Sequence, residues 1–237
     1  MTTQNTTITT GNPRFSKIFT DSATDGVWSG NVLLDSISSQ SLGILVPNAT
    51  LTFAQAEYES GGMAWRIQNA QTLAVSRYGF GALAGQNDLG RSQIAPVRVS
   101  PNDILTVFPV VRNASVTPNT CNALAWVSTS KGIELMEASA VPDNTATEMK
   151  TAVNNQSIGD AFFNSTLMKI CVQLEDDAQL DRIEIVDNLG GVQMTIQGGY
   201  RGTTASSRSN VYNLEAMGLQ VPIGKGFKLN VVTVAGA

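Results

Sequence analysis

The chain has 237 residues, a formal net charge of -4 and only 14% charged residues. With 42% hydrophobic residues, this composition indicates a folded protein whose surface is mostly neutral and polar, and it excludes an intrinsically disordered chain. The sequence contains no histidine, which excludes Ser-His-Asp and Cys-His catalytic sites and the commonest zinc ligand.

The first 14 residues, MTTQNTTITTGNPR, are polar and rich in threonine. They lack a basic region followed by an apolar one, so we predict no signal peptide, and no apolar run approaches the ~20 residues that span a bilayer. We expect residues 1–14 to form an extended arm that becomes ordered when it binds another molecule, such as a neighbouring subunit. A single domain over residues 15–237 is expected to follow, in a soluble protein made in the cytoplasm.

From Val27 onward, runs of β-branched and aromatic residues alternate with turn residues, a pattern typical of short β-strands. Residues 100–103, Ser-Pro-Asn-Asp, predict a turn, because proline fixes φ and the Asn and Asp side chains bond their own backbone. Residues 130–132 predict another turn. The strand candidates of this part of the chain are residues 27–34, 42–58, 63–70, 72–78, 95–113 and 122–139.

One segment departs from the β pattern. Thr145 and Glu148 have the spacing of a capping box, in which each side chain satisfies a backbone N–H at a helix start. We therefore predict a short helix over Thr145–Asn154, and a second short helix near Gly159–Asn164.

The β pattern is clearest near the C-terminus. In VQMTIQ, Val192, Met194 and Ile196 share one face of a strand, and the three polar residues share the other. This period of two predicts one buried face and one face that is wet or contacts a polar partner. Residues 188–191 predict a hairpin loop from the preceding strand, DRIEIVD, and a last strand is expected within residues 219–234.

The fold class that these elements predict is all-β. We expect an antiparallel β-sandwich of the jelly-roll type, with one short helix in an inter-strand loop. The sequence shows no internal repeat of fixed period.

A glycine-rich segment, RYGFGALAGQNDLG, spans residues 77–90. The spacing of Gly79, Gly81 and Gly85 is close to that of a dinucleotide-binding loop, but such a loop must lead into a helix whose N-terminus meets the pyrophosphate. The residues that follow contain a proline and no helical apolar stripe. We therefore predict a glycine loop between two strands that contacts a neighbouring subunit.

Carboxylates are the other candidates for chemistry. A cluster of four acidic residues over 175–181 has the ligands that Ca²⁺ prefers, but its spacing is not that of an EF-hand, and a solvated turn explains it equally well. Paired carboxylates for glycoside hydrolysis stay open, although solvent-facing carboxylates are the simpler interpretation. The acidic residues considered are Glu175, Asp176, Asp177 and Asp181, then Asp21, Asp25, Glu57, Glu59, Glu134 and Glu137.

The sequence assigns no catalytic, cofactor-binding or metal-binding residue. Trp28, Trp65 and Trp126 lie among apolar neighbours and are expected in the core, whereas a carbohydrate-binding sandwich displays a row of exposed aromatic rings. Cys171 lies in an apolar run and is also expected in the core, and a chain of this size does not need a disulfide with Cys121. The net negative charge argues against nucleic-acid binding.

The threonine- and asparagine-rich arm, the β-sandwich pattern, the lack of histidine and the closing strand LQVPIGKGFKLNVVTV together resemble bacteriophage virion structural proteins. The most similar type is the jelly-roll capsid cement (decoration) protein or a jelly-roll capsid subunit. The resemblance implies a non-enzymatic virion protein without cofactors, which forms a symmetric homo-oligomer, expected to be a trimer, and contacts other capsid proteins. It implies no recognition of nucleic-acid sequence and no membrane, and it transfers no site residue.

Two other functions stay open. The same strand pattern fits a β-sandwich module that binds carbohydrate or a cell surface, and a hydrolase with paired carboxylates is the third alternative.

Overall fold

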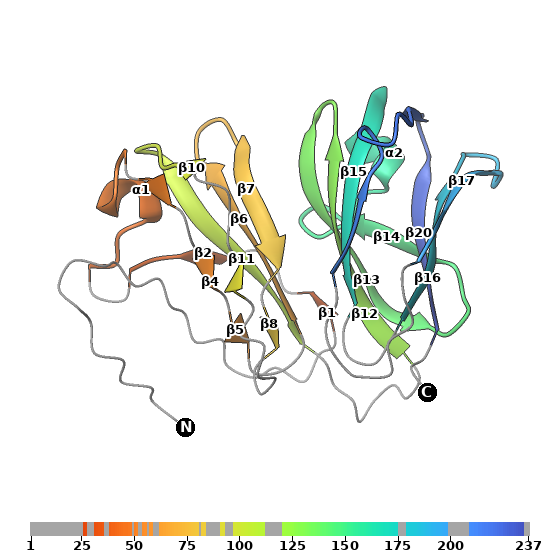
Figure 1. Ribbon diagram of the computed structural model, residues 1–237, viewed down its shortest axis with the longest axis horizontal. Helices are drawn as coiled ribbons and strands as arrows, with labels where there is room; N and C mark the ends of the chain where they lie inside the picture. The colour runs from red at the N-terminus through yellow and green to blue at the C-terminus, as the bar shows by residue number, and fades with distance from the viewer. Residues whose placement is uncertain are drawn as a thin grey trace.

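The predicted fold class is confirmed by the computed structural model (Figure 1). Strands predominate, nearly all of them pair antiparallel, and two four-residue helices are present among the described residues. The predicted arm over residues 1–14 lies outside those residues, and the single domain over 15–237 stays a prediction. The structure describes residues 26–27, 31–35, 38–48, 50–51, 54–55, 57–58, 62–80, 82–83, 91–92, 97–111, 120–174, 179–198 and 209–234.

Residues 26–111, here called the N-terminal unit, form one main sheet with the order β1-β11-β6-β7, in which β2 also pairs with β11. The strands of this sheet are β1 (Gly26–Val27), β2 (Asn31–Leu33), β6 (Gly62–Asn69), β7 (Val75–Phe80) and β11 (Asp103–Val111). The helix α1 (Leu42–Leu45) contacts β11. Three short strand pairs complete the unit: β3 (Thr50–Leu51) with β10 (Val97–Arg98), β4 (Ala54–Gln55) with β9 (Arg91–Ser92), and β5 (Glu57–Tyr58) with β8 (Ala82–Leu83).

Residues 120–234, the C-terminal unit, form a nine-stranded sheet with the order β17-β16-β20-β14-β13-β12-β15-β18, in which β19 also pairs with β15. The helix α2 (Ile158–Ala161) lies between β14 and β15. The strands are β12 (Thr120–Thr129), β13 (Gly132–Pro142), β14 (Thr147–Thr151), β15 (Ser165–Leu174), β16 (Gln179–Val186), β17 (Val192–Gln197), β18 (Ser209–Asn213), β19 (Val221–Ile223) and β20 (Lys228–Val234).

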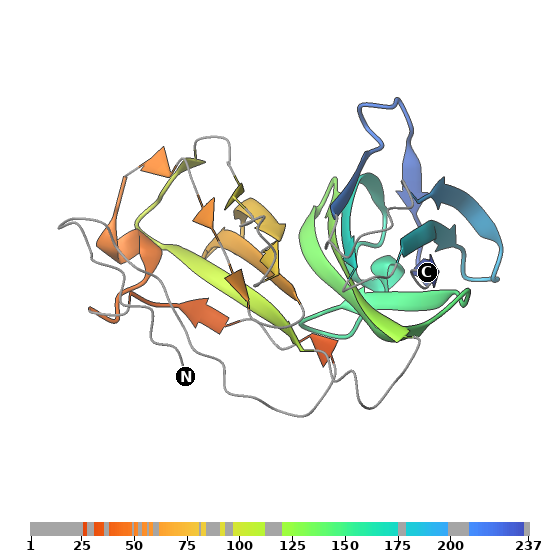
Figure 2. The same cartoon turned by 60° about the horizontal axis from the view of Figure 1, so that its bottom comes forward.

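The nine-stranded sheet curls around the larger of the two described cores (Figure 2). Strand β12 shows how both faces of this sheet are used. Ala123, Ala125 and Val127 point into the enclosed core, whereas Leu124 and Trp126 belong to a second cluster, which is shared with the N-terminal unit. Burial on both faces explains why this strand is a continuous apolar run instead of an alternating one.

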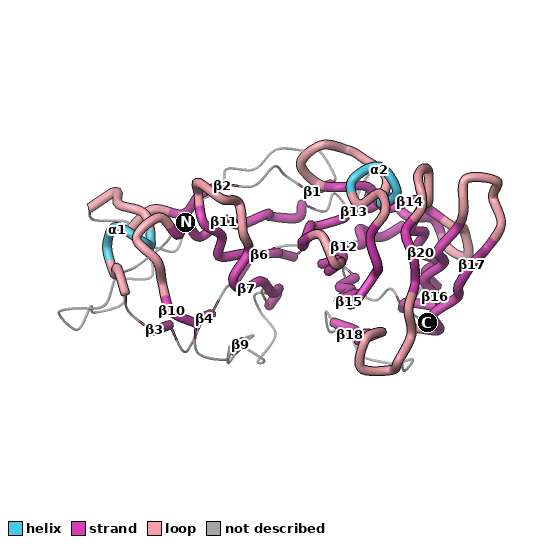
Figure 3. The backbone as a smooth tube through the Cα atoms, turned by 90° about the horizontal axis from the view of Figure 1, so that it is seen from above, coloured by secondary structure: helices cyan, strands magenta, loops and turns pink. Residues whose placement is uncertain are grey.

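The two units repeat one structure, although the sequence shows no repeat of fixed period. Residues 41–51, SLGILVPNATL, and residues 157–167, SIGDAFFNSTL, share Ser, Gly, Asn, Thr and Leu at positions 116 apart, starting from Ser41 and Ser157. In each unit a strand, a four-residue helix and a second strand follow one another in this region: β2, α1 and β3 in one, β14, α2 and β15 in the other. Both helices lie in the upper part of Figure 1, and Figure 3 looks down on them.

The sheet topology is repeated as well. The strand order β7-β6-β11-β2 of the N-terminal unit corresponds to β17-β16-β20-β14 of the C-terminal unit. Residues that face each other across these ladders occupy the same places in both units, so the register agrees residue by residue. The corresponding pairs are Leu33–Leu105 with Met149–Leu229, and Leu51–Val97 with Leu167–Val221.

Backbone conformations explain which residues the repeat retains. Asn48 and Asn164 both adopt a positive φ, 63° and 58°, a conformation that asparagine tolerates better than most residues. Their N–H groups donate to the carbonyls of Val99 and Ile223 at 2.9 and 3.0 Å. The shared asparagine therefore ends the helical turn in the same way in both units.

The shared glycine of each helix lies against the turn that precedes the last strand of its unit. A Cβ at Gly43 would collide with the backbone nitrogen of Asp103, and a Cβ at Gly159 with the backbone nitrogen of Phe227. Only glycine permits so close an approach of two backbones. The repeat is thus retained where the backbone demands a particular residue.

The helix predicted over Thr145–Asn154 is wrong. Half of this segment is β14, which lies between β13 and β20 and is hydrogen-bonded to both. The capping-box pattern is a local preference, and pairing with two neighbouring strands overrides it. The hydroxyl of Thr145 donates to the carbonyl of Asp143 at 3.1 Å, and the helix expected near residues 159–164 is present as α2.

The predicted hairpin over residues 188–191 is confirmed, because it joins β16 to β17. The alternation along β17 is confirmed too: Met194 and Ile196 are half-buried against the main core, whereas the three polar side chains are exposed. Val192 is 53% exposed, so the expected burial holds for two of the three apolar residues, and the pairing with β16 shifts register at this end of the strand. The turns predicted at residues 100–103 and 130–132 are also present.

Candidate assembly interface

The two units meet around Trp126 of β12, whose side chain is fully buried. Its indole Nε1 donates a hydrogen bond to the backbone carbonyl of Gly79 in β7, at 3.0 Å. The ring meets Phe108 of β11 edge-on, with centroids 6.1 Å apart, and lies 5.3 Å from the ring of Tyr78. Trp126 therefore joins the C-terminal unit to two strands of the N-terminal sheet through apolar area, ring contacts and one directed hydrogen bond.

The interface is apolar around this tryptophan. Its buried members come from both units, and partly buried side chains of β7 and β13 pack against them. Burial of such side chains is the main favourable contribution to this kind of contact. The buried residues are Ala64, Phe108, Leu124, Trp126, Leu135 and Cys171.

The glycine-rich segment contributes to this interface in a way that its sequence did not predict. Gly79 and Phe80 belong to β7 and not to a loop, while residues 84–90 lie outside the described residues. A Cβ at Gly79 would lie 2.8 Å from Cζ2 of Trp65, so the glycine makes room for that indole. The same residue presents its carbonyl to Trp126, and it therefore serves packing within one unit and attachment to the other.

An ion pair crosses the interface beside the aromatic cluster. Arg66 Nη1 of β6 lies 3.5 Å from Glu134 Oε2 of β13, and the guanidinium lies 5.2 Å from the centre of the Phe108 ring. Burial raises the pKa of Glu134 and lowers that of Arg66, in each case against the opposing effect of the partner's charge. An ion pair that is costly to desolvate adds little net stability. It still disfavours any other arrangement of the two units that would bury one of the charges without its partner.

Cys171 is confirmed as a core residue, on β15 within the same cluster. Burial raises the pKa values of the Cys171 thiol and of the Tyr78 hydroxyl beside it. Lys169 lies 5.8 Å from the centre of the Tyr78 ring. A thiol with a raised pKa is protonated at neutral pH and is not an activated nucleophile, so this cysteine contributes to packing.

The repeat allows this face of the N-terminal sheet to be compared with the equivalent face of the C-terminal unit, formed by β16, β17 and β20. Strand pairing fixes which positions correspond. The apolar and aromatic residues of the interface are replaced mostly by charged and polar ones on the equivalent face. The correspondences are Ala64 with Arg182, Arg66 with Glu184, Tyr78 with Thr195, Phe80 with Gln197 and Phe108 with Val232.

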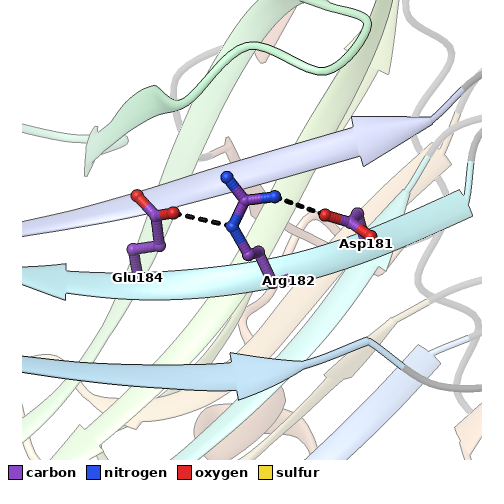
Figure 4. A network of polar contacts seen from close by, with 3 residues as sticks. All are labelled: Asp181, Arg182 and Glu184. Carbon is purple, nitrogen blue, oxygen red and sulfur yellow. Dashed lines mark hydrogen bonds and ion pairs between the residues drawn. The ribbon is translucent and has the colours of Figure 1, made fainter. Parts of the chain in front are cut away.

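Arg182 organises the polar face. Its Nε donates to Glu184 Oε1 at 2.7 Å and its Nη1 to Asp181 Oδ2 at 2.5 Å, so the guanidinium lies between two carboxylates (Figure 4). These hydrogen bonds raise the pKa of Arg182. On the neighbouring strands, Lys228 Nζ lies 3.9 Å from Glu148 Oε2. A charged face of this kind is comparable to the polar outer face of a capping repeat, which ends a stack of repeats.

The contact between the units is therefore heterologous. The N-terminal unit contributes β6, β7 and β11, whereas the C-terminal unit contributes β12, β13 and β15. These strands do not correspond in the repeat, so the two units meet through unlike faces. Heterologous contacts between separate subunits generate rings or open arrays, unlike two-fold contacts.

The carboxylates considered in the sequence are not brought together in the part of the chain that the structure describes. Asp181 pairs with Arg182, Glu134 pairs with Arg66, and Glu137 is half-buried in β13. No group of three or more His, Cys, Asp or Glu among the described residues is placed to hold a metal ion. Glu57 lies in β5, and the candidates outside the described residues are Asp21, Asp25, Glu59, Glu175, Asp176 and Asp177.

Two of the three tryptophans are confirmed as core residues, since Trp65 and Trp126 are both buried. Neither one therefore offers an exposed ring for stacking on a sugar, and Trp28 lies outside the described residues. No helix within the described segments is long and apolar enough to cross a bilayer.

Sequence reasoning missed Arg66, Tyr78 and Phe108, the residues that meet Trp126 and Glu134. One signal in the sequence pointed to such an interface: the strand over residues 122–127 is apolar on both faces. A strand of this kind needs a second layer to cover it. Which strands form that layer depends on pairings distant in the sequence.

No protein-family model matches the chain, and no curated protein or solved structure shows significant similarity to it.

Proposed function

We propose that this chain is a non-enzymatic virion structural protein, which assembles as a symmetric homo-oligomer on or within a phage capsid. The virion setting rests on the resemblance of the sequence to capsid cement proteins and jelly-roll capsid subunits. The assembly role rests on one observation: the chain contains two copies of one β unit, packed against each other through unlike faces around Trp126.

That arrangement supports assembly because subunits of a ring or a shell also meet through unlike faces. The N-terminal unit has a face that receives the other unit, and the C-terminal unit has a different face that docks onto it. Burial of β12 on both faces holds the two layers together, as a structural protein requires. A trimer is the oligomer that we expect.

Light scattering coupled to size exclusion, followed by sedimentation velocity from micromolar to near-millimolar concentration, tests the assembly role. We expect one discrete oligomer with the mass of a closed ring, a trimer in the first instance. A chain that remains monomeric over the whole range contradicts the proposal.

The virion setting needs a separate experiment. Quantitative mass spectrometry of purified phage particles should find this chain in a fixed ratio to the major shell protein. A chain found only in the cell lysate, and never in the particles, would contradict the virion role without affecting the assembly role.

A further inference from the structure

We infer that the free edge of β17 pairs with β17 of a second copy of this chain, so that the nine-stranded sheet continues across a two-fold axis. The inference rests on the proposed assembly role, and it names a surface through which copies of the chain would assemble. It adds a like-to-like contact to the unlike faces that join the two units within one chain, and through this contact two of the expected trimers would join as a hexamer.

Strand β17 is the last strand of its sheet and pairs only with β16 among the described strands. Its six residues, VQMTIQ, include no charged residue and no proline. Each edge strand exposes a row of unpaired N–H and C=O groups, and proteins usually protect such a row with a charge, a proline or a bulge. The pairing with β16 shifts register once, between Ile185 and Val186, so the regular part of this edge is residues 194–197. Without a charge or a proline, that part is a template for another strand.

The equivalent strand of the N-terminal unit shows the contrast. Strand β7 carries Arg77, whose Nη1 donates to the backbone carbonyl of Ser76 in the same strand at 2.9 Å. A charged side chain at this position opposes pairing with a further strand. At the other end of the nine-stranded sheet, β18 contains Asn210 and Asn213, and asparagine disfavours strands. Of these three sheet ends, β17 is the best suited to accept a strand.

The side chains of β17 are complementary to themselves in one register. When Met194 lies on the two-fold axis, Val192 faces Ile196 of the second copy, and Gln193 faces Thr195. Apolar side chains then meet apolar ones on one face, and polar side chains meet polar ones on the other. With Thr195 on the axis instead, Val192 would face Gly198 and gain no cover.

Burial within the molecule agrees with this register. Met194 and Ile196 pack against the main core but are only half-buried, and Val192 is 53% exposed. A second β17 would cover all three. Because the strand carries no charge, a two-fold axis brings no like charges together.

The substitution Thr195→Lys tests the contact. Thr195 is exposed on the polar face, so the lysine is expected to leave the fold intact while it places a charge on the pairing edge of each copy. Sedimentation equilibrium should show that the two-fold association constant falls by at least about tenfold. Gln156→Lys is the matched control, because it adds the same charge at an exposed loop position away from β17. This variant should leave association unchanged.

A cross-link tests the register without depending on affinity. Residues directly opposite in an antiparallel pair have Cβ atoms about 4.5–5.5 Å apart, which is near the range that a disulfide bridges. Met194→Cys should therefore form a covalent dimer under mild oxidation, whereas Gln156→Cys should not.

The outcomes separate this inference from the proposed function. A wild-type chain that remains monomeric overturns the assembly role itself. An oligomer that Thr195→Lys leaves unchanged, with no cross-link at Met194→Cys, overturns only the pairing of β17. Weakened association together with the cross-link supports both.

Discussion

Arg66 and Glu134 come from different units of the chain and form an ion pair across the contact between them, with Nη1 and Oε2 3.5 Å apart. The two side chains are not equally covered, because 12% of Arg66 and 38% of Glu134 is exposed. The guanidinium also lies over the Phe108 ring, so it keeps a favourable partner when the carboxylate is neutral. The carboxylate is thus the member of the pair whose ionisation changes with pH.

The substitution Glu134→Gln should change how stability depends on pH. Burial raises the folded-state pKa of Glu134, so the folded protein holds this proton more tightly than the unfolded chain does. The stabilisation from this effect is fully present below the ordinary glutamate pKa, about 4.3, and is lost as the pH rises through the folded-state pKa. Urea unfolding at several pH values should therefore show wild type losing stability relative to Glu134→Gln as the pH rises from 4 to 7. A difference that stays constant, or that grows with pH, contradicts the assignment.

The substitution Trp126→Phe should weaken the contact between the units. It removes the hydrogen bond to the Gly79 carbonyl and leaves space where the indole was, and we expect a loss of about 2–3 kcal/mol in the free energy of unfolding. The matched control is Trp65→Phe, because Trp65 is equally buried but donates to Phe80 within its own unit, at 3.3 Å. In urea, Trp126→Phe should separate the unfolding of the two units into two transitions, whereas Trp65→Phe should not. One shared transition in both variants would show that Trp126 does not couple the units.

The substitution Gly79→Ala should destabilise the N-terminal unit by about 1–3 kcal/mol through overpacking. The new methyl group would lie 2.8 Å from Cζ2 of Trp65, and a rigid, buried indole has little room to move. Trp65→Leu removes the obstructing ring, so Gly79→Ala should cost less in that background. A double-mutant cycle of unfolding free energies measures this coupling, and equal costs in both backgrounds would argue against a steric role for Gly79.

The two helix glycines should be comparably intolerant of substitution. Gly43→Ala and Gly159→Ala both force a Cβ onto backbone atoms of the facing turn, and we expect each to cost about 3 kcal/mol or more. Gly218→Ala is the control, because a Cβ added there would meet no atom within 4 Å. The positive φ of Gly218, 72°, is then the only source of strain, and we expect a cost of about 1–2 kcal/mol. Thermal unfolding of the three variants checks the ranking. A ranking with Gly218→Ala as the most damaging change would mean that the close approach is not what retains these glycines.

Local sequence patterns predicted those elements whose partners are close in the chain. The β16–β17 hairpin was found because the alternation of Met194 and Ile196 and the turn beside them lie within one short segment. The helix expected from Thr145 was wrong because β14 is held by β13 and β20, and β20 lies far along the chain. A capping box satisfies two backbone N–H groups at one end of a helix, and the pairing with two neighbouring strands outweighs this.

The repeat was not visible in the sequence for a related reason. Identity is concentrated at a few positions such as Gly43 and Asn48, where the backbone requires those residues. The spacing between the units also changes, because Val97 corresponds to Val221 whereas Leu51 corresponds to Leu167, so no single period fits. The interface was hidden as well, since the partners of Trp126 lie on strands that only the folded sheet brings together.

Joining the two units in one chain changes what their contact has to achieve. Only residues 112–119 separate β11 from β12, and a short connection holds two bodies at an effective concentration of about a millimolar. A contact that would dissociate at micromolar concentrations between separate molecules can then remain closed almost all the time. The cluster around Trp126 therefore needs no more than modest intrinsic affinity. Units produced as separate polypeptides should drift apart on dilution, even though each retains the residues that join them in the intact chain.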